Sequence, residues 1–338
     1  MIITRDTMDD ALGPKNTRYF GQGYQHVTHQ ITDLAIISEL FTGTVSATAA
    51  ITYPPTWSTK ATRPRTAHLS AVDALAIAAQ LAEAYLAHTH ILDAAARARM
   101  WLPAVEMTAG STAHTDLAAI PVHGHRIGMR IGPWGTHMII STFEFRIGTL
   151  QVTCQVQHDL GTPARTAENW ADIDHLLGGA DRRPYGRGYT HRRHDIRTIT
   201  VDPTQQQAGA HLDVHDTNAL GWQGLAANYE PSLSLIDATI CTAQLGQALA
   251  YTLEHVDRTN TGTLWMRRLR LRSSTPFLPI TEPIAMSVHV TRRQRLDRLG
   301  KSWRTYHLAG DIAAIRADAS LAFTIPTAPN GNPSGAAQ

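Results

Sequence analysis

An imidazole and a carboxylate lie five residues apart in the segment Thr-Ala-His-Leu-Ser-Ala-Val-Asp at residues 66–73. Within it, Ser70 and Asp73 precede a long apolar run in the Ser-x-x-Asp spacing of an N-terminal capping box. In the first turn of a buried helix, desolvation and the helix dipole shift the pKa values of such groups toward a range that suits acid–base chemistry. We interpret His68 and Asp73 as candidate catalytic residues, with helix capping as the alternative explanation of Asp73.

The stretch before this segment combines positive charge with an indole ring. Residues 54–65 contain three prolines, which predicts a loop. Cationic side chains in such a loop bind anionic or polarised groups such as a phosphate or a thioester carbonyl. A solvated loop with no ligand is the alternative. The candidate substrate-binding residues of this loop are Trp57, Lys60, Arg63 and Arg65.

The apolar run that contains Asp73 predicts one long helix over residues 69–90. Apolar residues occupy nearly all of its faces, which indicates a helix buried on all sides. Its few polar residues form one stripe, because Asp73 and Gln80 lie about 20° apart at 3.6 residues per turn. The stripe indicates a wet surface, such as a substrate tunnel or a junction between units. Ser70, Gln80 and Glu83 are therefore further candidate substrate-binding residues.

The chain is an internal duplication. When the sequence is displaced by 165 positions, ten of the 23 residues from 9 to 31 are identical, and Gly-x-Gly-Tyr-x-His-x-x-His occurs in both copies. A displacement of 164 or 165 also aligns the candidate residues, whose second-copy counterparts are Trp222, Ser234, Asp237 and Gln244. The second copy has no histidine that matches His68. We therefore expect two similar scaffolds and one active site, in the first copy.

Each copy shows two strand candidates, one long apolar helix and three or four further strand candidates. This order predicts an α+β fold, a tandem or double hot-dog in which an antiparallel sheet wraps around each helix. The expected units are residues 1–165, the active unit, and residues 166–325, with a flexible tail at 326–338. A β-sandwich is the main alternative, but it has no place for an apolar helix of about 20 residues.

Composition excludes several classes of protein. The 338 residues carry a net charge of +2, which does not indicate nucleic-acid binding. No stretch approaches the roughly 18 consecutive apolar residues of a membrane helix, and the first ten residues do not resemble a signal peptide. The two cysteines, Cys154 and Cys241, cannot build a disulfide framework. These features favour a cytoplasmic protein that binds neither nucleic acid nor membrane.

Three other patterns carry weaker predictions. The His-x-x-His pairs, His26 with His29 and His191 with His194, lack a neighbouring ligand, so no metal site is predicted. The Gly-x-Gly pairs lack the rest of a dinucleotide fingerprint, so no cofactor is predicted either. Arginine clusters, including Arg192 and residues 267–272 and 292–298, are typical of a solvated face. A docking patch for an acidic acyl carrier protein is the alternative.

Three segments of the first copy resemble the avirulence protein D (AvrD) family. They are Tyr-Phe-Gly-x-Gly-Tyr at residues 19–24, Tyr-Pro-x-x-Trp-Ser-x-Lys at 53–60, and the run that begins His-Leu-Ser-x-x-Asp-Ala-Leu at 68. The family is linked to the making of syringolides, which are acyl-sugar elicitors. The resemblance implies a reaction that joins a β-ketoacyl thioester to a pentulose such as xylulose. By analogy it also implies a hot-dog fold like that of the A-factor biosynthesis enzymes.

The working hypothesis is an enzyme that binds a β-ketoacyl thioester in a tunnel beside the first helix and transfers the acyl group to a sugar-like hydroxyl. The donor would be carried on coenzyme A or on an acyl carrier protein, and a homodimer is compatible with the sequence. One alternative is a double hot-dog dehydratase, hydratase or thioesterase, since these enzymes also use a carboxylate and an imidazole. The other is a non-catalytic protein that binds an acyl ligand.

Overall fold

The computed structural model describes residues 1–39, 42–60, 63–133, 137–218, 221–298 and 301–325, so the predicted tail at 326–338 lies outside the described residues. The helices are α1 (Met8–Leu12), α2 (Ala71–Thr89), α3 (Ala94–Ala98), α4 (Asp174–Leu177) and α5 (Leu235–Leu253). The strands of the first copy are β1 (Ile3–Thr7), β2 (Thr28–Ser38), β3 (Gly43–Thr52), β4 (Thr59–Lys60), β5 (Arg63–Pro64), β6 (Trp101–Ala109), β7 (Ile120–Ile131), β8 (Met138–Ile147) and β9 (Leu150–Asp159). Those of the second copy are β10 (Thr166–Asp172), β11 (Arg192–Asp202), β12 (Gln207–Asp216), β13 (Trp265–Ser273), β14 (Ile284–Arg298), β15 (Lys301–Ile312) and β16 (Ile315–Ile325).

Within the described residues, fourteen strands form one sheet in the order β1-β11-β12-β14-β15-β16-β13-β6-β9-β8-β7-β3-β2-β10. Every neighbouring pair is antiparallel, as in the central pair, where Leu269 of β13 lies opposite Met107 of β6. The order is symmetric about the β13–β6 pair: each strand of one copy has its counterpart from the other copy at the same distance from the opposite end. We define the first half as α2 together with the seven strands that run from β6 to β10 in this sheet order. The second half is α5 together with the seven strands that run from β1 to β13.

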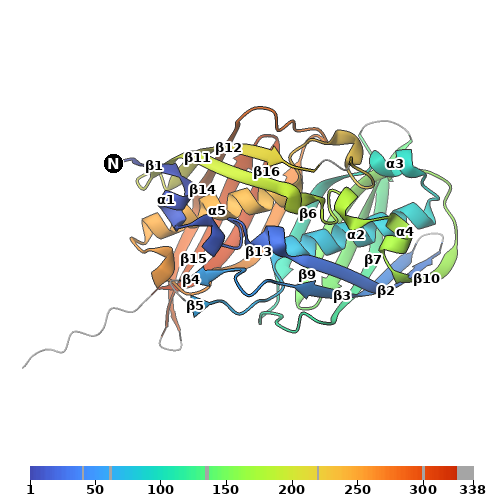
Figure 1. Ribbon diagram of the computed structural model, residues 1–338, viewed down its shortest axis with the longest axis horizontal. Coiled ribbons are helices and arrows are strands. Elements are labelled where there is room, and N and C mark those ends of the chain that lie inside the picture. Colours follow the sequence, from blue (N-terminus) through green and yellow to red (C-terminus); the bar gives the residue numbers. More distant parts are fainter. Residues whose placement is uncertain (40–41, 61–62, 134–136, 219–220, 299–300, 326–338) are drawn as a thin grey trace, which may run out of the picture.

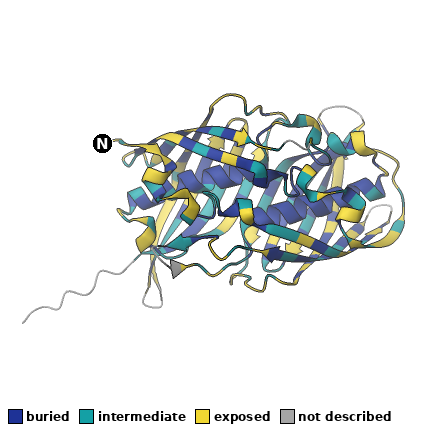
Figure 2. Ribbon diagram, viewed as in Figure 1, coloured by how far each residue is buried: buried dark blue, intermediate teal, exposed yellow. Residues whose placement is uncertain are grey.

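Both long helices are buried, as Figure 2 shows by their dark blue colour. Each begins with the predicted capping box, in which Ser70 and Asp73, or Ser234 and Asp237, satisfy the first backbone N–H groups. Figure 1 shows the two helices along the long axis of the molecule. Helix α2 contacts β2, β3, β6, β8 and β9, and α5 contacts β11 to β16. The predictions of a large antiparallel sheet and two long buried helices are confirmed.

The first strand of each copy pairs with the other copy. Strand β1 lies against β11, with Ile3 opposite Val201, and β10 lies against β2, with Thr166 opposite Ser38. The chain crosses between the halves near Tyr24 and Tyr189, whose rings stack with centroids 6.4 Å apart. The two copies are therefore interlocked, and each half of the sheet needs a strand from both.

A search of the described helices finds none that is long and apolar enough to span a membrane.

Candidate active site

The carboxylate of Asp73 is fully buried and lies at the centre of a polar cluster at the start of α2. It accepts hydrogen bonds from the Ser70 hydroxyl (2.6 Å) and from Nε2 of His29 (2.9 Å), and also from the Tyr53 hydroxyl. Burial alone would raise the pKa of Asp73, but the hydrogen bonds from His29, Ser70 and Tyr53 outweigh it and lower the pKa below its usual value. Asp73 is therefore a carboxylate, not an acid, at neutral pH.

His68 lies beside this cluster but does not pair with Asp73. Its Nδ1 lies 3.1 Å from the carbonyl oxygen of Thr66, which fixes Nδ1 as the protonated nitrogen and leaves Nε2 as an acceptor. The ring packs edge-on against Trp57 and is tilted against Trp265, with centroids 5.8 and 5.2 Å away. The link to Asp73 runs through Tyr53, whose hydroxyl also contacts the His68 carbonyl oxygen at 3.1 Å.

The imidazole that bonds Asp73, His29, was not among the residues proposed from the sequence. It is the second histidine of the repeated His-x-x-His pattern, which was weighed there only as a metal ligand. Its counterpart His194 contacts Asp237 in the same way, at 2.8 Å. The signal that could have found the pair was therefore the repetition itself, since both copies keep this histidine and the helix aspartate together.

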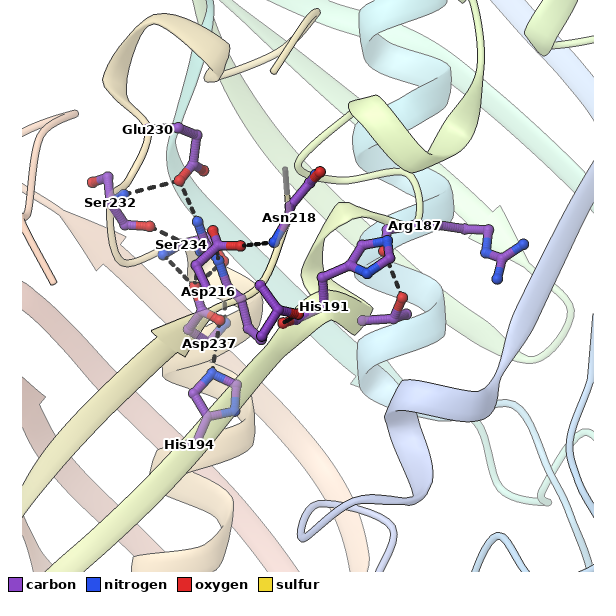
Figure 3. Close-up of polar contacts among 12 residues, drawn as sticks. Arg187, His191, His194, Asp216, Asn218, Glu230, Ser232, Ser234 and Asp237 are labelled. Carbon is purple, nitrogen blue, oxygen red and sulfur yellow. Dashed lines mark hydrogen bonds and ion pairs between the residues drawn. The ribbon is translucent and has the colours of Figure 1, made fainter. Parts of the chain in front are cut away.

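In the second copy an arginine, Arg192, fills the equivalent cluster. Figure 3 shows the acidic residues of this cluster, Glu230 and Asp237. The Arg192 guanidinium donates to Asp237 (2.5 Å) and to the Ser232 carbonyl oxygen (2.8 Å), and it also pairs with Glu230. Burial raises the pKa of Glu230 to about 7, although Arg192 opposes the shift. The prediction of a solvated face is wrong for Arg192, which is 1% exposed, because three carboxylates compensate its charge.

The first copy has different residues at the positions of Arg192 and of Ser232, which Arg192 contacts. Val27 aligns with Arg192, and His68 aligns with Ser232, so the first copy has neither the internal cation nor the contact it makes. The hydroxyl of Tyr19, which contacts Ser70 at 2.8 Å, and the Tyr53 hydroxyl lie at Asp73 instead. The cluster of the second copy is therefore closed by ion pairs, whereas the cluster of the first copy adjoins a cavity.

That cavity has a volume of about 730 Å³ and is lined by both copies. The first copy supplies residues that include Trp57, Lys60, Arg65, His68 and Ser70, and the second copy lines the cavity from α5 and from strands β13 to β16. Helix α2 contributes only Ala71, at its start. The expectation of a tunnel beside the first helix is therefore wrong, since the faces of α2 are packed against side chains and the space lies along α5.

One end of the cavity is strongly electropositive. Arg18, Lys60, Arg65 and Arg258 line it, and none of the described lining residues is Asp or Glu. Burial, followed by repulsion from Arg258 and Arg65, lowers the pKa of Lys60 to about 7. The lysine donates to the Thr261 hydroxyl at 2.8 Å and to two carbonyl oxygens. Arg18 is already paired with Asp9, whereas Arg65, Arg258 and the protonated form of Lys60 suit an anionic group, whose charge would offset theirs.

The whole chain can also be compared with known proteins. Residues 4–326 match the family model described as Pseudomonas avirulence D protein (AvrD). The chain belongs to the AvrD family. The resemblance noted from three short segments of the first copy is thereby confirmed over both copies. No curated protein sequence matches this AvrD-family chain.

Solved structures give more distant likenesses to this AvrD-family chain. A hot-dog protein of unknown function from Alicyclobacillus acidocaldarius is 10% identical, covering 87% of this chain and 96% of its own, with a TM-score of 0.36. The acyl-CoA thioesterase II TesB2 from Mycobacterium marinum is 12% identical, with coverage of 75% and 90% and a TM-score of 0.36. A dehydratase from type I polyketide synthases is 12% identical, with coverage of 83% and 93% and a TM-score of 0.35.

The structure separates the residues proposed from the sequence into three groups. Those that line the cavity are Trp57, Lys60, Arg65, His68, Ser70 and Gln244, and the last accepts a hydrogen bond from Arg18 at 2.5 Å. Those with other partners are Gln80, which bonds the Ala76 carbonyl, Glu83, paired with Arg97, and Trp222, Ser234 and Asp237, which surround Arg192. The Arg63 side chain lies outside the described part of the chain.

Proposed function

We propose that this AvrD-family protein is a biosynthetic enzyme that joins a β-ketoacyl thioester to a sugar-like hydroxylated acceptor such as xylulose. The observation that carries the proposal is His68, an imidazole with Nε2 left as an acceptor, at the wall of a cavity with a cationic end and an apolar interior. The cations would hold phosphate groups of the carrier, coenzyme A or an acyl carrier protein, and the interior would hold the acyl chain. No metal or organic cofactor is required for this reaction.

In the proposed reaction, Nε2 of His68 accepts the proton of the acceptor hydroxyl as its oxygen attacks the thioester carbonyl carbon. A carbon–oxygen bond forms, the carbon–sulfur bond breaks, and the proton passes to the departing thiolate. The first turn of α2 lies beside the same cavity, and its dipole favours the negative oxygen of the intermediate. A second step would close a ring, as the carbon between the two carbonyls adds to the acceptor ketone and water leaves.

Asp73 would act as a positioning residue in this scheme. It does not line the cavity, but its hydrogen bonds hold the Ser70 hydroxyl and the Tyr53 hydroxyl, and the latter holds the backbone of His68. As a buried carboxylate it fixes the geometry of three polar groups at the start of α2. This role replaces the direct His68–Asp73 pair expected from the sequence.

The fold proposed for this chemistry is a double hot-dog. Helix α2 contacts β6 and β2, which lie at opposite ends of the six strands from β6 to β2, and this supports a sheet curved around the helix. The contacts of α5 with β11 and β13 support the same arrangement in the second half. Both faces of each long helix are buried, as this architecture requires.

Mass spectrometry of reaction products tests the proposed function. The purified protein would be incubated with a β-ketoacyl thioester and xylulose, and in parallel with a β-hydroxyacyl thioester. We expect an acyl-sugar from the first mixture and no enoyl thioester from the second. His68→Ala and Asp73→Asn should each reduce the acyl-sugar at least 100-fold, on the scale of a lost general base, while replacement of the exposed His125 by Ala should not.

The other possible outcomes of this experiment would each indicate a different class of protein. Release of the free β-keto acid from the first mixture would indicate a thioesterase, and an enoyl product from the second a dehydratase. Binding of the thioester with no product would indicate an acyl-binding protein. Unchanged turnover in both the His68 and the Asp73 variants would contradict the assignment of the site.

A further inference from the structure

The deep part of the cavity lies in the second half of the molecule, between α5 and the strands that face it. Its wall contains Leu269, Val288, Leu308, Ala317, Ala319 and Leu321. The two threonines of α5 that also line it, Thr239 and Thr242, donate their hydroxyls to carbonyl oxygens of their own helix at 2.8 and 2.5 Å. They therefore present no free donor, and this part of the cavity is apolar.

The duplication supplies an internal comparison for this wall. The hairpin β8–β9 of the first half turns between the paired residues Ile147 and Leu150, and β15–β16 turns between Ile312 and Ile315. Two positions further from the turn, Phe145 pairs with Val152 in the first half, where the second half pairs Gly310 with Ala317. Another two positions on, Phe143 and Cys154 correspond to Leu308 and Ala319.

Equivalent strand positions carry bulky side chains in the first half and smaller ones in the second. Phe143 and Phe145 are at most 1% exposed and stack 5.9 Å apart, and Phe143 packs against Tyr85 of α2. In the second half the smaller Gly310, Ala317 and Ala319 line the cavity. A valine restores only part of the side-chain volume that is missing from the second half. Val288 lies opposite Gly310, whereas the equivalent Gly124 lies opposite Phe145. The cavity thus occupies the volume that aromatic side chains take in the first half.

We propose that this hollow holds the acyl chain of the substrate, and that Gly310, Ala317 and Ala319 set the longest straight chain that fits. The inference rests on the proposed function and adds to it a separate role for each copy. The first copy supplies the reacting groups around His68, and the second supplies the chain subsite. An extended saturated chain with an anionic carrier suits a cavity that has an apolar wall along α5 and cationic side chains elsewhere in its lining.

Binding of non-reactive probes tests the proposal without requiring turnover. β-Ketoacyl amides of increasing straight-chain length would be titrated into the protein, and their dissociation constants measured by calorimetry. We expect the wild-type affinity to rise by about fourfold for each added methylene until the hollow is full, as burial of about 0.8 kcal/mol per methylene implies, and then to fall. Ala319→Leu should move this maximum to a shorter chain.

A second variant and a matched control guard against misfolding. Ala317→Val copies Val152, which the first half already accommodates at the equivalent place, and should also shorten the preferred chain. Cys154→Ala enlarges the equivalent position of the first half and should leave the preferred chain unchanged. An unchanged maximum in both second-half variants, a longer preferred chain in Cys154→Ala, or no binding of any probe would overturn the chain subsite. A shortened chain together with no product from any thioester would retain the subsite and reject the proposed reaction.

Discussion

A single difference between the copies, Val27 against Arg192, decides what each helix aspartate can do. In the second copy the guanidinium neutralises Asp237 and fills the space around it. In the first copy tyrosine hydroxyls share that space, and the aspartate is held by them and by His29. The ion pairs of the second cluster indicate a structural role, and under the proposed function the first cluster supports the reacting groups.

This assignment predicts that one substitution, made in each copy, destabilises the two copies to different extents. Asp237→Asn leaves the buried Arg192 with less compensating charge, and loss of such a partner costs about 3 kcal/mol of unfolding free energy. Asp73→Asn keeps a side-chain oxygen that can accept hydrogen bonds from Tyr53 and His29 and leaves no buried arginine unpaired, so we expect a cost of about 1 kcal/mol and loss of turnover. Urea denaturation of both variants measures the difference. Equal destabilisation would contradict the structural role given to Arg192.

A buried histidine pair predicts a weakness toward acid. Burial, together with repulsion from His90 and Arg126, lowers the pKa of His158 to about 3, so the folded state binds its proton far less readily than the unfolded chain, whose pKa is about 6.5. The free energy of unfolding should therefore fall as the pH drops below about 6.5. His158→Gln cannot titrate and should lose about 2 kcal/mol less between pH 6.5 and pH 5 than the wild type does.

Unfolding free energies from urea titrations at several pH values provide the check. The effect should be small between pH 7 and pH 8, where His158 is mostly neutral in both states. A wild-type stability that stays level from pH 6.5 to pH 5, or falls in parallel with that of His158→Gln, would show that His158 is not the origin of the acid sensitivity.

At the scale of elements, the two capping boxes are local signals that the sequence predicts well. Both long helices were expected from apolar runs that begin at Ser-x-x-Asp, and α2 and α5 begin one residue after Ser70 and Ser234. The strands β1 and β10 were not predicted, because they are short and exist only through pairing with the other copy. The pairing of His29 with Asp73 was missed for the same reason, since 44 residues separate them.

The two caps have the same structure, but under the proposed function only the first adjoins the reacting groups. Ser70→Ala and Ser234→Ala should each cost about 1 kcal/mol of stability, the usual contribution of an N-cap serine. Only Ser70→Ala should reduce turnover, because Ser70 lines the cavity and Ser234 does not. Thermal denaturation and product formation, measured on both variants, separate the two effects. Equal activity in the two variants would place the chemistry away from the start of α2.

The whole molecule is one interlocked body. The sheet runs without a break through the β6–β13 pair, and each copy lends its first strand to the other half. The sequence revealed the duplication but not this exchange, since contacts between copies leave no local pattern. Nor did it reveal that the cavity follows α5, because that depends on which half has small residues facing its helix.

Interlocking predicts one cooperative unfolding transition in place of two. Phe145→Ala in the first half and Phe323→Ala in the second remove buried rings, at a cost of about 3 to 5 kcal/mol each. Each should shift the whole transition, so that near-ultraviolet circular dichroism and tryptophan fluorescence stay superimposed. Separate transitions, with each variant affecting only one, would mean that the halves unfold independently.

The central claim is that one reacting centre at the start of α2 serves a chain held along α5. A crystal structure with a non-reactive β-ketoacyl thioester analogue tests it most directly. The account predicts the acyl carbonyl beside His68 and the first turn of α2, with the chain running between α5 and β16 past Ala319. An analogue bound beside α2 in the first half, or outside the cavity, would contradict it.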